Sequence, residues 1–165
     1  MTGGGSFEEF YTGSVGRLLG HLYLVTGDFH EAEEVVQEAF ARASVRWSWL
    51  RDYNAPEAWV RRVAMNLAAD RGRKLRRHAR AMLQMGPPPE APEVSVETLA
   101  LVEALRTLPI RQRQAIVLHH LVGLPVGEVA QTLRMPAGTV KSLLSRGRRA
   151  LAARLDEAEE VLYRP

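Results

Sequence analysis

The sequence of 165 residues contains no cysteine, which excludes disulfides, thiolate metal sites and cysteine nucleophiles. It also lacks an apolar run of the roughly 18 residues that a membrane-spanning helix needs. The first ten residues include Glu8 and Glu9 and have no basic segment of the kind that opens a signal peptide. We therefore expect a cytoplasmic protein with no membrane partner.

Motifs of catalytic sites are also missing. The sequence has neither a phosphate-binding glycine loop nor a nucleophile elbow. His30-Glu31 begins like a zincin helix, but Glu34 stands where the second histidine ligand is required. His119 and His120 are adjacent and point about 100° apart on a helix, so they cannot hold one metal from one face. We expect no enzymatic activity, no cofactor and no metal site.

The charges are distributed unevenly along the chain. The net charge is only +3, and the apolar content of 46% is ordinary for a globular protein. However, residues 71–80 contain six Arg or Lys and no acid, whereas residues 28–38 contain five acids and no Arg or Lys. Blocks of opposite sign indicate two partners of opposite character.

The clearest structural pattern is a helix-turn-helix within residues 126–149. Apolar residues recur at helical spacing over residues 126–133, and only residues 134–136 separate them from a second helix. Proline is favoured at the first position of a helix, so the second helix should begin near Ala137, next to Pro136.

The second helix divides into an apolar face and a small, polar, cationic face. Hydroxyl side chains allow a helix to approach base edges closely, while Lys and Arg reach bases and phosphates. A solvated basic face is the alternative for such a helix taken alone, and the preceding helix favours DNA binding. The DNA-binding residues predicted here are Thr139, Lys141, Ser142, Ser145, Arg146, Arg148 and Arg149.

These residues resemble region 4 of bacterial sigma factors. The resemblance rests on Gly-Thr-Val-Lys-Ser at residues 138–142, on Arg146 and Arg149, on Glu-Val-Ala at residues 128–130 and on Leu-Pro-Ile-Arg-Gln-Arg at residues 108–113. It is similar to the extracytoplasmic-function (ECF) group, which retains little more than regions 2 and 4. The family often has Arg, Ser and Gly where this chain has Leu143, Pro125 and Arg134. The resemblance implies that this domain reads the minus-thirty-five promoter element.

Two capped helices are predicted at the beginning of the chain. Ser6 and Glu9 form a capping box that opens the first helix, and Gly27 ends it. Asp28 and Glu31 repeat the capping-box pattern for a second helix that reaches about Ala43.

The outer face of this second helix is acidic and is similar to sigma region 2.2. The similarity covers Asp28, residues 32–38 and Phe40. It implies docking on the β′ clamp helices of RNA polymerase. A solvated acidic face near a helix N-terminus is the alternative. The predicted polymerase-binding residues are Asp28, Glu34, Gln37 and Glu38.

An aromatic connection at residues 47–54 precedes a long helix that starts at Asn54 and Pro56 and reaches about Arg80. We expect Trp59, Val63 and Leu67 to face inward, whereas Trp47 and Trp49 could be either core or base-stacking residues. The run 59–67, with Asp70 and Arg71, is similar to sigma regions 2.3 and 2.4, which open and read the minus-ten element. The DNA-binding residues predicted here are Trp49, Tyr53, Asn54, Arg61, Arg62, Asn66, Arg71 and Arg73.

The complete prediction is an all-α protein with two small helical domains, residues 1–82 and 96–165, joined by a proline-rich linker at residues 83–95. Short helices are expected over residues 99–108 and 110–121. The resemblance implies a sigma initiation factor, monomeric when free, whose partners are promoter DNA and core RNA polymerase at the β′ clamp helices and the β flap. It also allows an anti-sigma factor. The alternatives are a two-domain helix-turn-helix regulator that is not a polymerase subunit, and a protein-binding adaptor.

Overall fold

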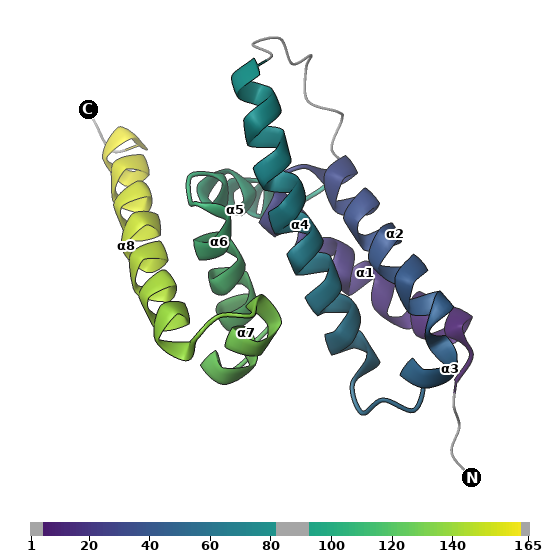
Figure 1. The fold of residues 1–165 in the computed structure, drawn as a ribbon. Helices are drawn as coiled ribbons and strands as arrows, with labels where there is room; N and C mark the ends of the chain where they lie inside the picture. Colours follow the sequence, from purple (N-terminus) through teal and green to yellow (C-terminus); the bar gives the residue numbers. More distant parts are fainter. Residues whose placement is uncertain (1–4, 82–92, 163–165) are drawn as a thin grey trace. The chain divides into compact units, whose positions relative to one another are not determined.

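The computed structural model describes residues 5–81 and 93–162, with side chains at residues 5–74 and 93–157. All secondary-structure elements within these ranges are helices, which confirms the all-α prediction (Figure 1). The chain forms two compact units, Met1–Pro92 and Glu93–Pro165. Most of the predicted linker, up to residue 92, lies outside the described residues, so its extended form stays a prediction.

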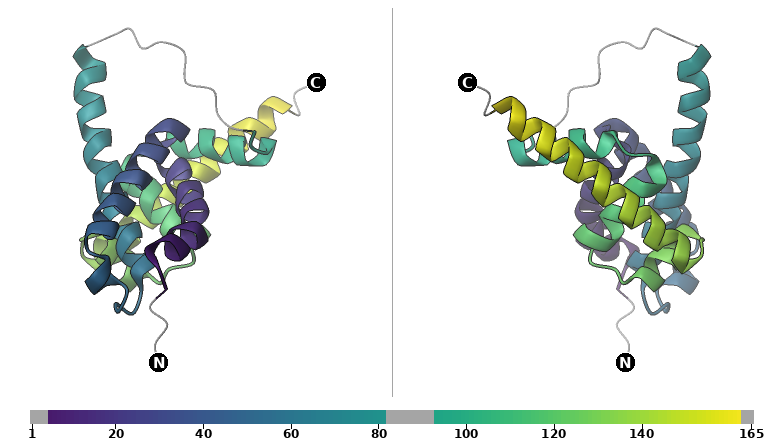
Figure 2. Two further views of the ribbon diagram at one scale, coloured as in Figure 1. Left: turned by 90° about the vertical axis from the view of Figure 1, so that its right-hand side faces the viewer. Right: turned by 90° about the vertical axis from the view of Figure 1, so that its left-hand side faces the viewer.

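The first unit contains α1 (Phe7–Thr26), α2 (Phe29–Val45), α3 (Trp47–Leu50) and α4 (Pro56–Ala81). Helices α1, α2 and α4 pack against one another, and they run side by side in Figures 1 and 2. The short helix α3 forms the first part of the aromatic connection predicted at residues 47–54, because residues 47–50 close a helical turn directly after α2.

The helix ends of this unit follow the predicted capping residues. The Ser6 hydroxyl accepts from the Glu9 amide at 3.1 Å and the Glu9 carboxylate accepts from the Ser6 amide at 3.3 Å, which is a complete capping box. Gly27 has a φ of 71° and ends α1 in the left-handed region. Asp28 caps α2 by accepting from the Glu31 amide at 2.9 Å, but the predicted second half of this capping box is not formed, because the Glu31 carboxylate contacts Arg71.

The core of the first unit uses small residues on α4. Val60, Ala64, Met65, Ala68 and Ala69 are buried where α4 meets its neighbours. The predicted inward face of Trp59, Val63 and Leu67 is therefore wrong, because these three side chains lie on another face and are only half-buried. Small side chains allow α1 and α2 to approach α4 closely, a preference that the spacing of large apolar residues does not reveal.

An aromatic cluster at one end of this unit shows whether Trp47 is a core residue or a base-stacking residue. The Trp47 ring stacks on Phe10 with centroids 5.0 Å apart and meets the Phe7 ring edge-on at 5.6 Å. Phe40 joins the same cluster and is buried. Trp47 is consequently a packing residue, whereas Trp49 remains 56% exposed.

The second unit contains α5 (Val96–Arg106), α6 (Ile110–Ile116), the π-helical segment η1 (Val117–Leu121), α7 (Val126–Leu133) and α8 (Ala137–Leu162). Figure 2 shows α8 as one long helix. The predicted helix over residues 110–121 is confirmed in extent, although its second half is wound as a π-helix. Helix α5 begins at Val96, before the predicted start at Leu99, and Leu99 is 45% exposed.

The turn between α7 and α8 has the predicted three residues, and α8 begins at Ala137 as expected. Arg134 ends α7 with a φ of 54°, which is a left-handed conformation that favours glycine. Gly147 lies where α8 crosses α6, and a Cβ atom at this position would be 3.0 Å from the Ile116 Cγ1 atom. The glycine therefore permits the close approach of these two helices.

Candidate nucleic-acid and protein interfaces

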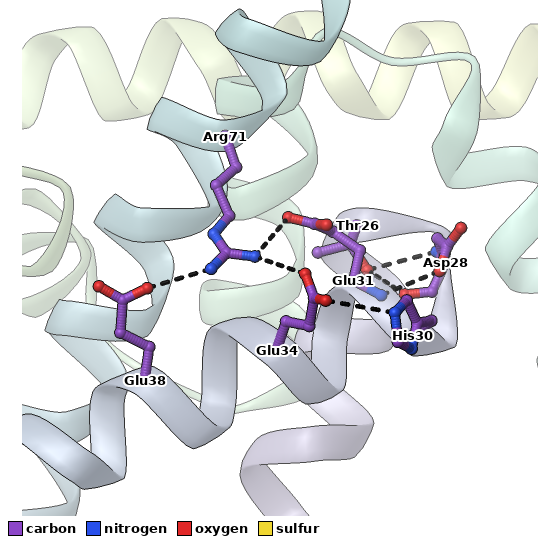
Figure 3. Close-up of polar contacts among 7 residues, drawn as sticks. All are labelled: Thr26, Asp28, His30, Glu31, Glu34, Glu38 and Arg71. Carbon is purple, nitrogen blue, oxygen red and sulfur yellow. Dashed lines mark hydrogen bonds and ion pairs between the residues drawn. The ribbon is translucent and has the colours of Figure 1, made fainter.

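The acidic face of α2 surrounds one arginine of α4. Arg71 is 3.5 Å from Glu31, 2.8 Å from Glu34 and 3.1 Å from Glu38, measured between guanidinium nitrogens and carboxylate oxygens (Figure 3). The three acids follow one another at spacings of three and four residues, so they share one face of the helix. We call these three carboxylates and Arg71 the α2 acidic cluster.

Further polar groups of the chain bind the outer edge of this cluster. His30 Nε2 is 3.2 Å from Glu34, and Arg42 is 2.6 Å from the Glu38 oxygen that faces away from Arg71. The Gln37 amide donates to the Tyr11 hydroxyl at 2.8 Å. The predicted docking residues thus lie together on α2, but their side chains are already engaged within the chain.

The electrostatic balance of the cluster favours the ionised forms. Burial acts to raise the pKa of Glu38, but hydrogen bonds from Arg71 and Arg42 outweigh it and hold that pKa below its ordinary value. Burial likewise acts to lower the pKa of Arg71, while the hydrogen bonds to Glu38 and Glu34 raise it. The lowered pKa of Glu38 and the raised pKa of Arg71 both favour the charged forms of these two groups.

The sequence did not indicate that Arg71 belongs to this cluster. Residue type and the basic run 71–80 favoured a phosphate contact, and that role stays a prediction. Glu31 is not among the predicted docking residues, and the structure places it beside Arg71. Which residue of α4 faces which residue of α2 depends on how the two helices pack, and the sequence pattern carries no signal for it.

Trp49, within α3, and Tyr53, just after it, form an exposed aromatic surface. Their ring centroids are 5.3 Å apart, and the side chains are 56% and 40% exposed. Together with Ser48 and Asp52 they line a surface hollow of about 430 Å³. Large aromatic side chains that remain exposed and are held beside a hollow can stack on an unpaired base. Asn54 lies next to them and is also exposed.

The remaining predicted DNA-binding residues of α4 differ in their accessibility. The Arg61 side chain is only 12% exposed and is 4.0 Å from Glu57, while Asn66 donates to the Arg62 carbonyl at 2.8 Å. Arg73 is exposed and forms an ion pair with Asp70. The structure therefore brings these cations onto one helix but leaves them unequally open to a ligand.

A half-buried histidine, His21, lies beside Glu57 and Arg61. Glu57 accepts from two nitrogens of Arg17, each at 3.1 Å. Burial and the nearby positive charges of Arg61 and Arg17 lower the pKa of His21, while Glu57 opposes the change. These surroundings favour the neutral form of His21.

The polar face of α8 is open. Thr139, Lys141, Ser142, Arg146 and Arg149 are exposed, Ser145 is half-buried, and the opposite face buries Val140 and Leu144. The Arg148 guanidinium is 3.4 Å from His120 Nε2. Burial, His119 and Arg148 together lower the pKa of His120. The predicted recognition residues therefore share one accessible cationic surface.

The described ranges contain no group of three or more metal-ligating side chains. Among the helices that the structure describes, none is long and apolar enough to span a bilayer.

Comparisons with known proteins cover most of the chain. Residues 10–80 match the family model "Sigma-70 region 2" and residues 98–151 match "Sigma-70, region 4". The RNA polymerase sigma-E factor of Streptomyces coelicolor is 33% identical over 142 residues, which is 85% of this chain and 80% of that protein. The ECF RNA polymerase sigma factor SigW of Bacillus subtilis is 33% identical over 150 residues, covering 81% of this chain and 80% of the relative.

Solved structures have the same fold. The sigma factor RpoE of Bartonella quintana, in complex with the anti-sigma factor NepR, aligns with a TM-score of 0.76 at 22% identity and covers 91% of this chain and 96% of its own. CnrH, in complex with the cytosolic domain of CnrY, has a TM-score of 0.62 at 26% identity and covers 92% of this chain and 88% of its own.

Proposed function

Because the chain belongs to the sigma-70 family, in its extracytoplasmic-function group, we propose that its two units divide promoter recognition between the surfaces described above. It is a sigma transcription initiation factor, and its partners are core RNA polymerase and promoter DNA. In this proposal it performs no covalent chemistry of its own. The alternative of a regulator that is not a polymerase subunit is not favoured, because the match includes region 2 as well as region 4.

The proposal assigns polymerase docking to the face of α2. Its support is that the exposed carboxylates of Glu34 and Glu38 lie in one row beside Gln37, with side-chain exposures of 48% and 36% for the two acids. A row of partly exposed carboxylates on a rigid helix suits a cationic helical surface such as the β′ clamp helices. Asp28 has a capping role and supports this face from its N-terminal end.

Strand opening is assigned to the hollow beside Trp49 and Tyr53. Single-stranded bases bind by stacking on exposed aromatic rings, and cations near them hold the phosphates. The observation that carries the proposal is the combination of this exposed aromatic pair with an acidic docking face in one unit. A regulator that binds only duplex DNA has no use for either surface.

Duplex recognition is assigned to α8. Ser142 and Arg149 lie near the centre of its polar face and are suited to base contacts, while Lys141 and Arg146 lie to either side and are suited to phosphates. Arg148 lies further toward the edge, beside His120. Two of the structural neighbours were solved with anti-sigma proteins, and we propose a partner of that kind for this chain as well.

Transcription with purified core polymerase tests the docking assignment. Glu34→Arg combined with Glu38→Arg should lower core affinity by at least about ten-fold, since reversal replaces attraction with repulsion at two contacts. Glu33→Arg is the matched control for Glu34→Arg alone, because Glu33 is exposed on another side of the same helix and the change in net charge is the same. If Glu34→Arg and Glu33→Arg lose equal core affinity, the loss is an effect of net charge. Unchanged core affinity in the double variant would refute docking through this face.

The strand-opening assignment is tested on two templates. Trp49→Ala with Tyr53→Ala should reduce open-complex formation on duplex promoters by roughly 10- to 100-fold, from a stacking contribution of about 1–3 kcal/mol per base. A template already mismatched across the minus-ten element should lose less. Val45→Ala serves as the control, because Val45 is 84% exposed and lies on α2. Equal losses on both templates would indicate a defect in folding or in general DNA binding instead.

A further inference from the structure

Arg71 holds an unusual position between two surfaces with different assigned partners. Its guanidinium contacts three carboxylates of the α2 face, with the closest distances to Glu34 and Glu38 (Figure 3). It is carried by α4, the helix that also carries Arg61, Arg62 and Arg73. The Arg71 side chain therefore contacts the docking face of α2, although it is attached to α4, the helix with the predicted DNA-binding residues.

The contacts of Arg71 are exchangeable on energetic grounds. The Arg71 side chain is 30% exposed, and those of Glu31, Glu34 and Glu38 are 20%, 48% and 36% exposed. Ion pairs with this much access to water contribute little to stability, because water rehydrates both partners when the pair separates. A cation brought by a binding partner can therefore replace Arg71 without leaving a buried charge.

The same contacts already neutralise part of the negative charge to which a cationic partner would bind. Arg71 binds the inner oxygens of Glu34 and Glu38, and His30 and Arg42 bind their outer oxygens. A carboxylate that already accepts from a guanidinium offers less attraction to a second cation. A cationic partner that binds this face must consequently displace the internal cations from the carboxylates.

We propose that Arg71 is an exchangeable counter-ion of the α2 face, displaced from Glu34 and Glu38 by the cations of the docking partner and then available to bind a DNA phosphate. This inference rests on the proposed docking function of α2. It makes Arg71 a link between the two binding events, because the N–H groups that now donate to Glu34 and Glu38 become available to a phosphate only when those carboxylates are released. By linkage, docking must favour DNA binding by the same factor by which DNA favours docking.

The test measures the affinity of the full chain for core polymerase, first alone and then with a DNA duplex that carries an open minus-ten bubble. Arg71→Gln should bind core alone about two- to five-fold more tightly than wild type, since one competing ion pair is removed. Wild type should gain core affinity when the bubble DNA is added, and Arg71→Gln should gain less. Arg71→Lys keeps the charge without the planar fork, so it should bind core with intermediate affinity.

Lys74→Gln is the matched control. Lys74 is an exposed cation one turn further along α4, and its removal changes the net charge by the same amount. It should change core affinity less than Arg71→Gln and should retain the gain from bubble DNA. Thermal unfolding of all variants completes the experiment, and Arg71→Gln should melt close to wild type.

Three results would overturn the inference. Weaker core binding by Arg71→Gln would make Arg71 a direct contact or a support for the carboxylates. Equal effects of Arg71→Gln and Lys74→Gln on core affinity would show an effect of net charge alone. A large fall in the melting temperature of Arg71→Gln would show that Arg71 stabilises the fold. The underlying function fails separately, if Glu34→Arg with Glu38→Arg leaves core affinity at the wild-type level.

Discussion

The acidic face of α2 and the cationic face of α8 carry opposite charges and also differ in how far those charges are compensated within the chain. On α2, Arg71, His30 and Arg42 lie within 3.5 Å of carboxylate oxygens. On α8, no carboxylate of the described residues pairs with Lys141, Arg146, Arg148 or Arg149.

This difference separates two modes of association. Uncompensated surface cations create a field that reaches about one Debye length, roughly 8 Å at physiological salt, and steer the protein toward DNA. Compensated carboxylates create little field at a distance and act only after their internal partners are exchanged. Binding through α8 should therefore depend steeply on salt, whereas docking through α2 should depend on local geometry.

The largest expected effect concerns α8, where the charges are open. Arg149→Ala should lower the affinity of the holoenzyme for its preferred site by about 1–3 kcal/mol and change the preferred minus-thirty-five sequence. Lys141→Ala should weaken all sequences alike and reduce the salt slope by about one unit. Site selection at two salt concentrations measures both. A uniform loss of affinity in Arg149→Ala, with the wild-type preference retained, would show that Arg149 positions the helix without reading bases.

The two faces also differ in how well the sequence predicts them. The open face of α8 could be predicted because helical periodicity alone separates buried Val140 and Leu144 from exposed Lys141 and Arg146. The capping residues Ser6 and Asp28 were also correct, since a cap depends on residues within one turn.

Features that depend on contact between distant segments were missed. The pairing of Arg71 with α2 is set by the packing of two helices whose contacting residues are 33 to 40 positions apart. The burial of Ala64 in place of Trp59 also depends on that packing, because close helix approach favours small side chains. Helix α3 is only four residues long, which is too short for a periodic signal.

A smaller effect concerns stability in acid, and it contrasts the half-buried His21 of the first unit with the exposed His120 of the second. Burial, Arg61 and Arg17 lower the pKa of His21 below that of the unfolded chain. The unfolded state therefore binds the proton more readily, and the stability that neutral His21 contributes is lost as pH falls below about 6.5. His21→Gln should flatten this dependence. All tryptophans of the sequence lie in the first unit, at positions 47, 49 and 59, so their fluorescence reports its unfolding.

His120→Gln provides the comparison for His21. His120 is exposed, and solvent screening reduces any effect of its lowered pKa on stability. The tryptophan transition of His120→Gln should keep the pH dependence of wild type. A loss of pH dependence in His120→Gln, or its persistence in His21→Gln, would contradict the assignment of the acid sensitivity to the group around Glu57.

The smallest expected effect compares the two residues that end a helix in the left-handed region, Gly27 after α1 and Arg134 after α7. A side chain in this conformation costs about 1–2 kcal/mol, because its Cβ atom crowds the following carbonyl. Gly27→Ala should therefore destabilise the first unit by about 1 kcal/mol, measured by tryptophan fluorescence. Arg134→Gly should stabilise the second unit by less than about 1 kcal/mol, since glycine removes the strain but also gives the unfolded chain more freedom. Circular dichroism of the full chain follows this gain, because the second unit has no tryptophan. A loss of stability in Arg134→Gly would mean that the arginine side chain contributes more than its strained backbone costs, and the turn of the helix-turn-helix would then be stabilised by side-chain contacts.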